Sequence, residues 1–347
     1  MKSSVLTVLL TSSLAMAACG GDEPSEAMPP SDGAGVGSGA GGEGPPSGVG
    51  SGGDPDVQAP SVTTTTPLDG EVGVTEKQVI AIEFSEAMDR ASVESAYSSA
   101  LLPADAVAFS WNDAGTVLEV EALEGLEYAT GGLDDAPLEY EVTIGEAAAD
   151  LAGNPLDGAL TFRFSTLRHV EMSIPAEESL TGYAVRLGSS TVIVYDGTDP
   201  RAGDWLLNSN ERTQRGFVAF YLDEVPEGPL DFTSVRLRAP LSKLVGTPGA
   251  LGDLLVYPVF DPAFTTDAFD AEPLGPGMKV ESNGGEVPLF GADLEGSVVE
   301  TLANREVRDN LAQYRIGYTL DANDNGASDR VEFATGTVTL EISFLSE

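Results

Sequence analysis

Short segments that alternate apolar and polar residues, bounded by Gly, Pro, Asp and Asn, place the strongest constraint on the fold of this chain. Ile80–Phe84, Tyr140–Ile144 and Leu160–Phe164 place apolar side chains at every second position. A period of two indicates strands that bury one face and expose the other. Several short strands of this kind, with a hairpin turn expected at Ser110–Thr116, predict a β-sandwich over residues 59–167.

Residues 168–347 carry the same signal, and a break near Thr166–His169 separates the two regions. Each region is long enough to bury a core of its own, so we expect an all-β chain of two sandwich domains. A helix is expected near Gly296–Leu311, because Val299, Leu302 and Ala303 lie at helical spacing. The strands expected in the second domain are Thr191–Tyr195, Phe217–Leu222, Ser234–Leu237, Leu254–Val259, Tyr314–Leu320 and Thr337–Phe344.

The single cysteine, Cys19, directly follows the small residues Ala17 and Ala18. The apolar stretch Val5–Leu14 before them is too short to cross a bilayer, which predicts a signal peptide over residues 1–18. The arrangement resembles the lipobox of bacterial lipoproteins, whose cysteine is lipidated and becomes the first residue of the exported chain. The resemblance implies a membrane anchor at Cys19 and a place in the bacterial cell envelope, at the outer membrane or cell surface. The alternative is a secreted protein with an incidental thiol.

A low-complexity segment rich in Gly, Pro, Ser and acidic residues follows the cysteine and ends near residue 58. It offers little apolar surface to offset the entropy of ordering, so residues 19–58 are expected to form a disordered linker. About 39 residues of Gly-rich coil have a typical end-to-end distance of roughly 35 Å. The segment would therefore hold the folded domains away from a membrane.

Charge and composition exclude several classes of function. The chain has 56 Asp and Glu against 17 Lys and Arg, a formal net charge of −39, which excludes a nucleic-acid partner. One cysteine permits no internal disulfide and no cysteine-based zinc site. The only histidine, His169, lies at the expected domain junction, where we expect a structural role.

The first domain resembles the bacterial Ig-like domain of S-layer proteins (SbsA-like). Four blocks carry the resemblance in order and spacing: Thr66–Val74, Ile82–Asp89, Ala149–Leu156 and Phe162–Thr166. The resemblance implies a structural, surface-exposed module with no chemistry of its own. In the third block, Gly153 is suited to a turn position with positive φ.

The second domain resembles the DNRLRE-type jelly-roll modules of secreted bacterial proteins. The resemblance rests on Phe217–Pro226 followed by Asp231–Arg238, a strand, a short loop with Pro and a second alternating strand. It implies a jelly-roll-like β-sandwich, and some relatives are classed as carbohydrate-binding. No glycan-contacting residue carries over to this chain.

Residues 321–332 fit the calcium-loop pattern D-x-[DN]-x-[DN]-G-x5-E without a mismatch. The flanking segments look like strands, whereas an EF-hand needs helices. The alternative is a hairpin in which Asn325-Gly326 forms a type I′ turn that needs no ion. The candidate calcium ligands are Asp321, Asn323, Asn325, Ala327, Asp329 and Glu332.

Together these features predict a surface-anchored, non-catalytic lipoprotein with a structural, adhesive or glycan-binding role. Its expected partners are the membrane, cell-surface glycans and envelope proteins, and Ca²⁺ is the one candidate cofactor. The rival is a polysaccharide-processing enzyme that uses an acidic pair of the second domain, although 56 acidic residues guarantee coincidental pairs. Trp205 in an exposed loop would suit sugar stacking, but packing in the core or at its rim is the commoner fate of Trp205 and Trp111.

Replacing Cys19 by Ala tests the anchor. The variant should move from the membrane fraction to the soluble fraction or fail to mature, because only the cysteine thiol accepts the lipid. Metabolic labelling with a clickable fatty acid measures the modification. Equal labelling of wild type and Cys19→Ala would contradict the anchor.

Overall fold

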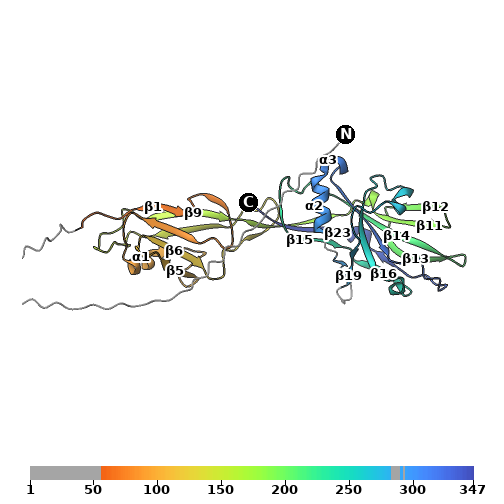
Figure 1. The fold of residues 1–347 in the computed structure, drawn as a ribbon, viewed down its shortest axis with the longest axis horizontal. Coiled ribbons are helices and arrows are strands. Elements are labelled where there is room, and N and C mark those ends of the chain that lie inside the picture. The colour runs from red at the N-terminus through yellow and green to blue at the C-terminus, as the bar shows by residue number, and fades with distance from the viewer. Residues whose placement is uncertain (1–55, 283–289, 292–293) are drawn as a thin grey trace, which may run out of the picture. The chain divides into compact units, whose positions relative to one another are not determined.

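The computed structural model describes residues 56–282, 290–291 and 294–347 (Figure 1). Cys19, the expected signal peptide and nearly all of the expected linker lie outside these residues. Strands dominate the described part, so the prediction of an all-β chain is confirmed. None of the helices in this part has both the length and the apolar character needed to span a membrane.

The first sandwich consists of two four-stranded sheets. One has the order β1-β3-β6-β5 and contains Val62–Thr66 (β1), Ile80–Phe84 (β3), Val117–Ala122 (β6) and Val107–Trp111 (β5). The other has the order β2-β9-β8-β4 and contains Glu71–Val74 (β2), Leu160–Thr166 (β9), Glu139–Ile144 (β8) and Tyr97–Ser98 (β4). The predicted alternation is confirmed, because Ile80, Ile82 and Phe84 are buried between the sheets.

The hairpin and the turn predicted for the first sandwich are both present. β5 and β6 pair in antiparallel register, which confirms the hairpin around Ser110–Thr116. Gly153 has a φ of 90°, as the turn before Pro155 requires. A short helix, α1 (Arg90–Ala96), begins where the Asp89 side chain accepts a hydrogen bond from the Ala91 N–H.

The second sandwich packs a small sheet against a large one. The small sheet has the order β15-β23-β10-β7 and contains Asp231–Arg238 (β15), Thr339–Ser346 (β23), Arg168–Pro175 (β10) and Ala129–Gly131 (β7). The large sheet runs β16-β22-β13-β14-β21-β17-β18, with β11 paired to β14 and β12 paired to β11. Its strands are Leu241–Val245 (β16), Arg330–Phe333 (β22), Arg201–Leu207 (β13), Asn210–Tyr221 (β14), Leu311–Tyr318 (β21), Leu254–Val259 (β17), Met278–Lys279 (β18), Gly182–Leu187 (β11) and Thr191–Asp196 (β12).

Minor elements complete the second sandwich. A two-stranded ribbon joins Glu281–Ser282 (β19) to Phe290–Gly291 (β20). The 3-10 turns are Glu178–Leu180 (η1), Pro248–Leu251 (η2), Thr266–Asp270 (η3) and Thr335–Thr337 (η4). The expected helix is present as α2 (Glu295–Ala303), followed by α3 (Arg305–Arg308). Its buried face differs by one residue from the expectation: Val298 and Thr301 are buried whereas Val299 is exposed. Burial of Thr301 is possible because its hydroxyl donates to the Ser297 carbonyl.

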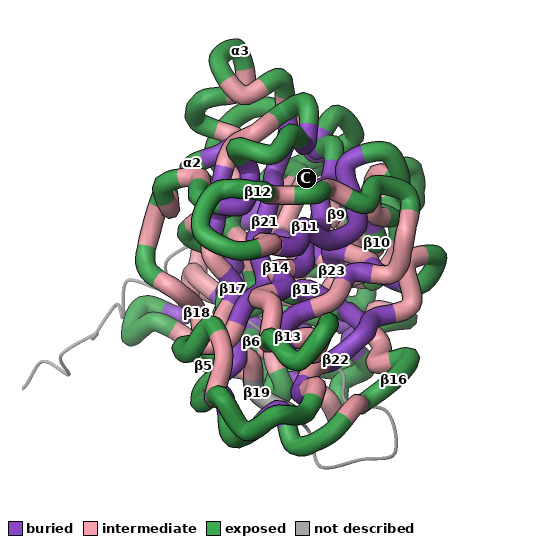
Figure 2. The backbone as a smooth tube through the Cα atoms, turned by 90° about the vertical axis from the view of Figure 1, so that its right-hand side faces the viewer, coloured by how far each residue is buried: buried purple, intermediate pink, exposed green. Residues whose placement is uncertain are grey.

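β14 is buried on both faces. Val218 and Phe220 join the core between the sheets, and Phe217 and Ala219 join a second cluster with residues of η3. All four residues are 0% exposed, and Figure 2 shows β14 among the buried segments. This explains the uninterrupted apolar run of the sequence, because a strand covered on both sides has no polar face.

A strand from the first sandwich region joins the sheet of the second. β7 pairs in parallel with the start of β10, and Leu133 packs against the core of the second sandwich. The Arg168 guanidinium donates to the carbonyls of Leu133 (2.7 Å), Asp135 and Glu347 (2.7 and 3.0 Å). The described residues from 56 to 347 belong to one compact unit. The boundary at 167/168 stays a prediction, and the paired strands β7 and β10 cross it.

Replacing Arg168 by Ala should loosen this junction. The change leaves three carbonyls without a charged donor, which we expect to cost about 1–3 kcal/mol. The unfolding transition should broaden or split in two, since the sandwiches lose a shared contact. Differential scanning calorimetry measures it. Arg238→Ala is the matched control, because the ion pair of Arg238 with Glu341 is exposed. Equal effects of both variants would contradict a special role for Arg168.

Candidate functional site

The segment between β21 and β22 contains the predicted calcium loop. β21 pairs with β14 and β17, whereas β22 pairs with β13 and β16, so the two strands are not neighbours. Positive φ values fall at Asp324 (54°) and Gly326 (75°), with Asn325 between them. A type I′ turn needs two consecutive residues with positive φ. The hairpin alternative at Asn325-Gly326 is therefore wrong, and the loop is a crossover held by its side chains.

Asp329 anchors this loop. It is 1% exposed, and its Oδ1 accepts a hydrogen bond from the Thr247 N–H at 2.5 Å. Its Oδ2 accepts from the amide groups of Asn323 (2.8 Å) and Asn325 (2.6 Å). These hydrogen bonds, led by that of Thr247, lower the pKa of Asp329 because they stabilise its charged form. The carboxylate is thus ionised at neutral pH.

Two glycines make room for the anchor. Gly203 has a φ of 131° and Gly246 a φ of 65°. A Cβ at Gly203 would overlap the Asp329 carbonyl, and a Cβ at Gly246 would overlap Asp329 Oδ1 and the Ser328 carbonyl. The backbones of β13 and of the turn after β16 approach the loop this closely only because both positions lack a side chain.

Asp204 on β13 meets the same loop from the other side. Its N–H donates to the Asp329 carbonyl at 2.8 Å, and its Oδ1 accepts from the Asp329 N–H at 2.6 Å. Asp204 is 0% exposed, and its Oδ2 has no hydrogen-bond partner among the described residues. Burial raises the pKa of Asp204, and the charges of Glu211 and Asp329 add to the rise.

The structure brings together only part of the predicted ligand set. Asn323 and Asn325 meet Asp329 through their amide NH2 groups, which donate to Asp329 Oδ2. Their amide oxygens accept instead from the N–H groups of Asn325 and Ala327, so the oxygens of the three residues do not converge on one point. Asp321 instead pairs with Arg215 at 3.1 Å on the surface. The Glu332 carboxylate, which follows in β22, is bound by Arg330 at 2.8 Å and lies 3.6 Å from Arg201.

Asp204 lies outside every motif of the sequence. The signal that could have pointed to Asp204 is its position: an acidic residue inside the strand Arg201–Leu207, close to the buried Ala202. Sequence spacing cannot pair it with Asp329, because 125 residues separate the two. Only the sheet register makes them neighbours.

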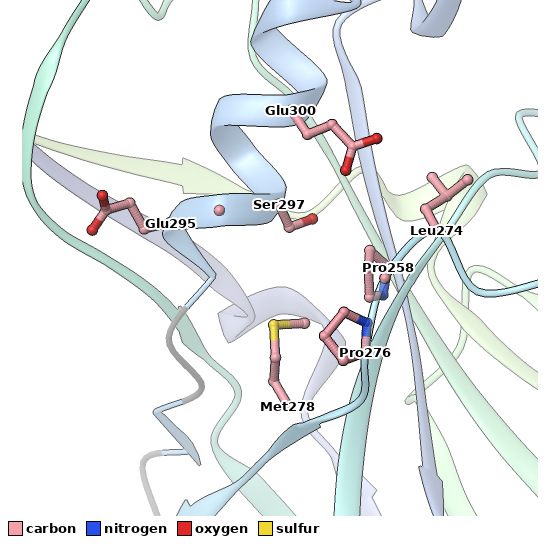
Figure 3. A pocket seen from close by; sticks show the side chains of 9 residues that line it. Pro258, Leu274, Pro276, Met278, Glu295, Ser297 and Glu300 are labelled. Atoms are coloured by element: carbon pink, nitrogen blue, oxygen red, sulfur yellow. The ribbon is translucent and has the colours of Figure 1, made fainter. Parts of the chain in front are cut away.

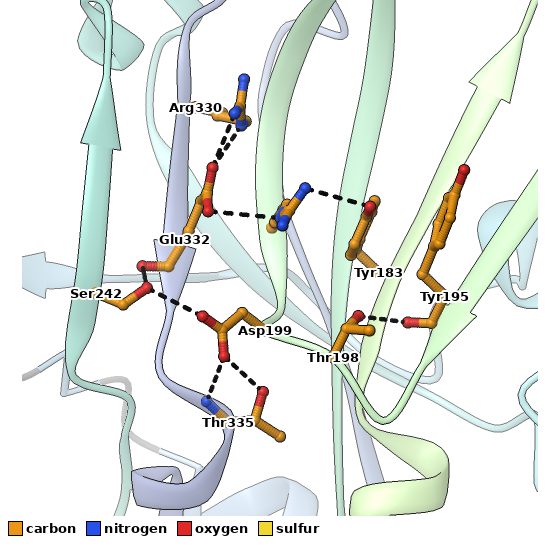
Figure 4. A network of polar contacts seen from close by, with 9 residues as sticks. Tyr183, Tyr195, Thr198, Asp199, Ser242, Arg330, Glu332 and Thr335 are labelled. Atoms are coloured by element: carbon orange, nitrogen blue, oxygen red, sulfur yellow. Dashed lines mark hydrogen bonds and ion pairs between the residues drawn. The ribbon is translucent and has the colours of Figure 1, made fainter.

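A second polar cluster lies on β11, β12, β13 and β22 (Figure 4). The rings of Tyr183 and Tyr195 stack with centroids 4.7 Å apart and planes at 13°. The Arg201 guanidinium lies 4.6 Å from the centroid of the Tyr183 ring, and it also faces Glu332. Tyr195 is 36% exposed on β12, which pairs only with β11 among the described strands. The stacked pair therefore presents an aromatic edge to solvent.

Asp199 borders a hollow of about 390 Å³ that Glu178, Thr198 and Thr335 also line. Its carboxylate accepts hydrogen bonds from the N–H (3.1 Å) and hydroxyl (2.9 Å) of Thr335. Figure 4 also shows its contact with Ser242. These contacts hold η4 against the sheet, so Asp199 has a structural task.

Another hollow, of about 550 Å³, lies between α2 and the segment 274–278. Pro258, Leu274, Pro276 and Met278 supply most of its side chains (Figure 3). Glu295 and Glu300 lie on different sides of α2 in this view, so their carboxylates do not face each other across the hollow. The pair lacks the facing geometry of glycoside-hydrolase carboxylates.

The first sandwich carries an acidic group of its own. Asp56, Glu86 and Asp150 place carboxylate oxygens within 4.8 Å of one another. Asp150 is engaged by Asn154, whose backbone N–H and side-chain amide donate at 2.8 and 2.7 Å. The hydrogen bonds between Asp150 and Asn154 stabilise the turn that contains Gly153.

The remaining aromatic and histidine expectations have clear outcomes. Trp205 lies in β13 and not in a loop, so it is not an exposed loop platform. Trp111 packs at the rim of the first core, stacked on Phe84 at 6.1 Å, with its indole N–H donating to Glu94. His169 on β10 shares a hydrogen bond of 2.8 Å with the Thr233 hydroxyl, which agrees with a structural role.

The described residues define an all-β protein in which an Ig-like sandwich precedes a second, larger sandwich. Residues 56–166 match the family model described as the bacterial Ig-like domain. The match spans the first sandwich and leaves the second outside it. Among curated proteins, none matches this chain.

Comparison with solved structures gives distant likenesses. An L,D-transpeptidase from Mycobacterium smegmatis has 16% identity and a TM-score of 0.23, covering 66% of this chain and 79% of that protein. The N-terminal part of the bacterial S-layer protein SbsC has 15% identity and a TM-score of 0.22, covering 47% and 40%. Domains 1–6 of SbsC give 16% and 0.22, covering 84% and 41%. The chain thus spans less than half of either SbsC structure, and at these TM-scores the likenesses carry no functional argument.

Replacing Gly246 by Ala should disrupt the loop anchor. The variant adds a Cβ that overlaps Asp329 Oδ1, on a backbone that L-residues rarely adopt, so we expect a loss of about 3 kcal/mol or more. Gly326→Ala is the matched control: its φ is also positive, but its Cβ enters open space, so only about 1–2 kcal/mol should be lost. Urea denaturation compares them. Equal losses would contradict the tight packing around Asp329.

Proposed function

We propose that this protein is a surface-anchored, non-catalytic lipoprotein with a structural role in the bacterial cell envelope. The single observation that carries the proposal is the Ig-like sandwich at residues 56–166, joined by paired strands to a second sandwich. Modules of this kind serve as rigid spacers, because each strand is held by its neighbours and by a core between two sheets.

The expected lipid anchor and linker complete this proposal. A lipidated Cys19 would hold the chain at a membrane through acyl chains, each buried CH₂ contributing about 0.8 kcal/mol. The Gly-rich segment after it would set the reach of the sandwiches above the membrane. A kinship of the second sandwich with DNRLRE-type modules belongs to the same proposal.

The state of the carboxylates supports a non-catalytic role. Asp199 holds η4, Glu332 is bound by Arg330, and Asp329 holds its own loop. A polysaccharide-processing enzyme would instead need two carboxyl groups about 5–10 Å apart that face one open site. Asp199 in one hollow binds Thr335, and Glu295 and Glu300 in the other point apart.

The tyrosine pair favours glycan contact as the specific form of this role. Aromatic rings at a sheet edge offer flat apolar surface to a sugar ring while their hydroxyls stay in water. Tyr195 has this placement, and stacking on Tyr183 fixes its orientation at low entropic cost. Arg201 and Glu332 supply polar groups beside the pair.

A glycan array with the purified chain tests the proposal. We expect binding to envelope polysaccharide without release of reducing ends, and a loss of about 5- to 30-fold in affinity for Tyr195→Ala, since a stacked ring contributes on the order of 1–2 kcal/mol. Tyr221→Ala is the matched control, because Tyr221 is 38% exposed and lies at the end of β14. Release of reducing ends would contradict the non-catalytic role. Equal losses for both variants would contradict glycan contact at the tyrosine pair.

A further inference from the structure

One edge of β12 is open. β12 pairs with β11 on one side and with no described strand on the other. Its pairing with β11 keeps a regular register over six residue pairs, from Gly182 with Asp196 to Leu187 with Thr191. A strand edge of this kind presents unpaired N–H and C=O groups, which are able to bind the backbone of another strand.

The alternation of hydrogen bonds shows which backbone groups point outward. The Gly197 N–H donates to the Thr181 carbonyl at 2.9 Å, directly before the paired stretch of β11 and β12. In an antiparallel ladder, every second residue pair exchanges hydrogen bonds. The odd-numbered residues of β12 therefore bond β11, whereas the N–H and C=O groups of Val192 and Val194 point away from it.

The other edge strands of the second sandwich are protected against such pairing. β15 and β16 each have a bulge, and they contain basic residues, namely Arg236 and Arg238 in β15 and Lys243 in β16. β7 and β18 have only three and two residues. Bulges, basic side chains and shortness are features that keep sheet edges from pairing. β12 has none of them: five consecutive β-branched or aromatic residues precede its single charge, Asp196.

The side chains of β12 indicate the kind of strand that fits beside it. Ile193 and Tyr195 are 37% and 36% exposed, whereas Val192 and Val194 pack against the apolar cluster that contains residues of η3. A fitting partner strand has apolar side chains and no acid opposite Asp196. β12 itself meets both conditions, because its only charge lies at its end. These observations favour a second copy of this chain.

We propose that β12 pairs with β12 of a second copy, in antiparallel direction about a two-fold axis through Ile193. The two copies of Ile193 then face each other, and Val192 of each copy exchanges hydrogen bonds with Val194 of the other. This register keeps the exposed faces of both strands on one side of the joined sheet. It also places Asp196 of each copy opposite the exposed Ser190 of the other, so that no two acids meet.

The size of the contact and the charge of the chain set the affinity. Two six-residue strands bury little area, so the dimer is weak in solution, with a Kd in the micromolar range or above. The net charge of −39 on each copy adds long-range repulsion, which salt screens. Copies held at one membrane by the proposed anchor would meet at a high effective concentration. The pairing uses the backbone of β12, whereas the proposed glycan contact uses the ring of Tyr195, so the two proposals are independent.

Sedimentation velocity of the purified chain tests the pairing. Between about 5 and 500 µM, wild type should shift from monomer to dimer. The dimer should be tighter in about 1 M than in about 0.15 M NaCl, because the Debye length falls from about 8 to about 3 Å. Ile193→Glu places two carboxylates opposite each other at the two-fold axis and should weaken the dimer about tenfold.

Leu244→Glu is the matched control. It makes the same change from an exposed apolar residue to an acid, but on the protected edge strand β16, so the dimer should persist. An equimolar mixture of Ile193→Glu and Ile193→Lys should restore association, because opposite charges then face each other across the axis. If Ile193→Glu fails to fold, Ser190→Asp replaces it, since this exposed position faces Asp196 of the other copy and should weaken the dimer in the same way.

Three results would overturn the pairing. The first is a wild-type chain that stays monomeric over the whole range at high salt. The second is an equal loss of association in Leu244→Glu, which would assign the effect to general charge. The third is a mixture of the two Ile193 variants that associates no better than either variant alone. Glycan binding is measured separately on the same proteins, so failure of the dimer is distinct from failure of the proposed function.

Discussion

The burial of β14 on both faces is the constraint on which the second sandwich depends. Phe217 and Ala219 pack into one apolar cluster, and Val218 and Phe220 pack into the other. A strand that must be buried on two sides packs against η3 and its neighbours on one face and against the small sheet on the other. Strands at its flanks are then free to carry polar residues, and both polar clusters lie there.

The charged groups of those two clusters are balanced in different ways. Around Tyr183, each charge has a partner: Arg330 and Arg201 face Glu332, and Asp199 is saturated by Thr335 and Ser242. Around Asp329, the carboxylate is instead bound by three N–H donors, from Thr247, Asn323 and Asn325. Neutral donors of this kind stabilise a buried carboxylate without an opposite charge.

The junction shows why a boundary drawn in the sequence differs from a boundary in space. The break at Thr166–His169 separates two alternating regions, and each region has its own core. β7, however, comes from the first region and pairs with β10 of the second, where Arg168 binds carbonyls of both. Parallel pairing of two distant segments produces no periodic pattern in the sequence of either segment. The pairing therefore cannot be predicted from the sequence.

The sequence by itself determined the all-β class, the hairpin of β5 and β6, the turn at Gly153 and six strands of the second domain, because alternation and turn residues act over a few positions. It missed β10, β11, β13 and β16. It also marked the loop that holds Asp329. Only the tertiary structure decided that β21 and β22 are not neighbours, that Asp321 and Glu332 are bound by arginines, and that Asp204 meets Asp329 across 125 residues. The reason is physical: strand register and close glycine contacts are set by the whole sheet, whereas a motif records only spacing along the chain.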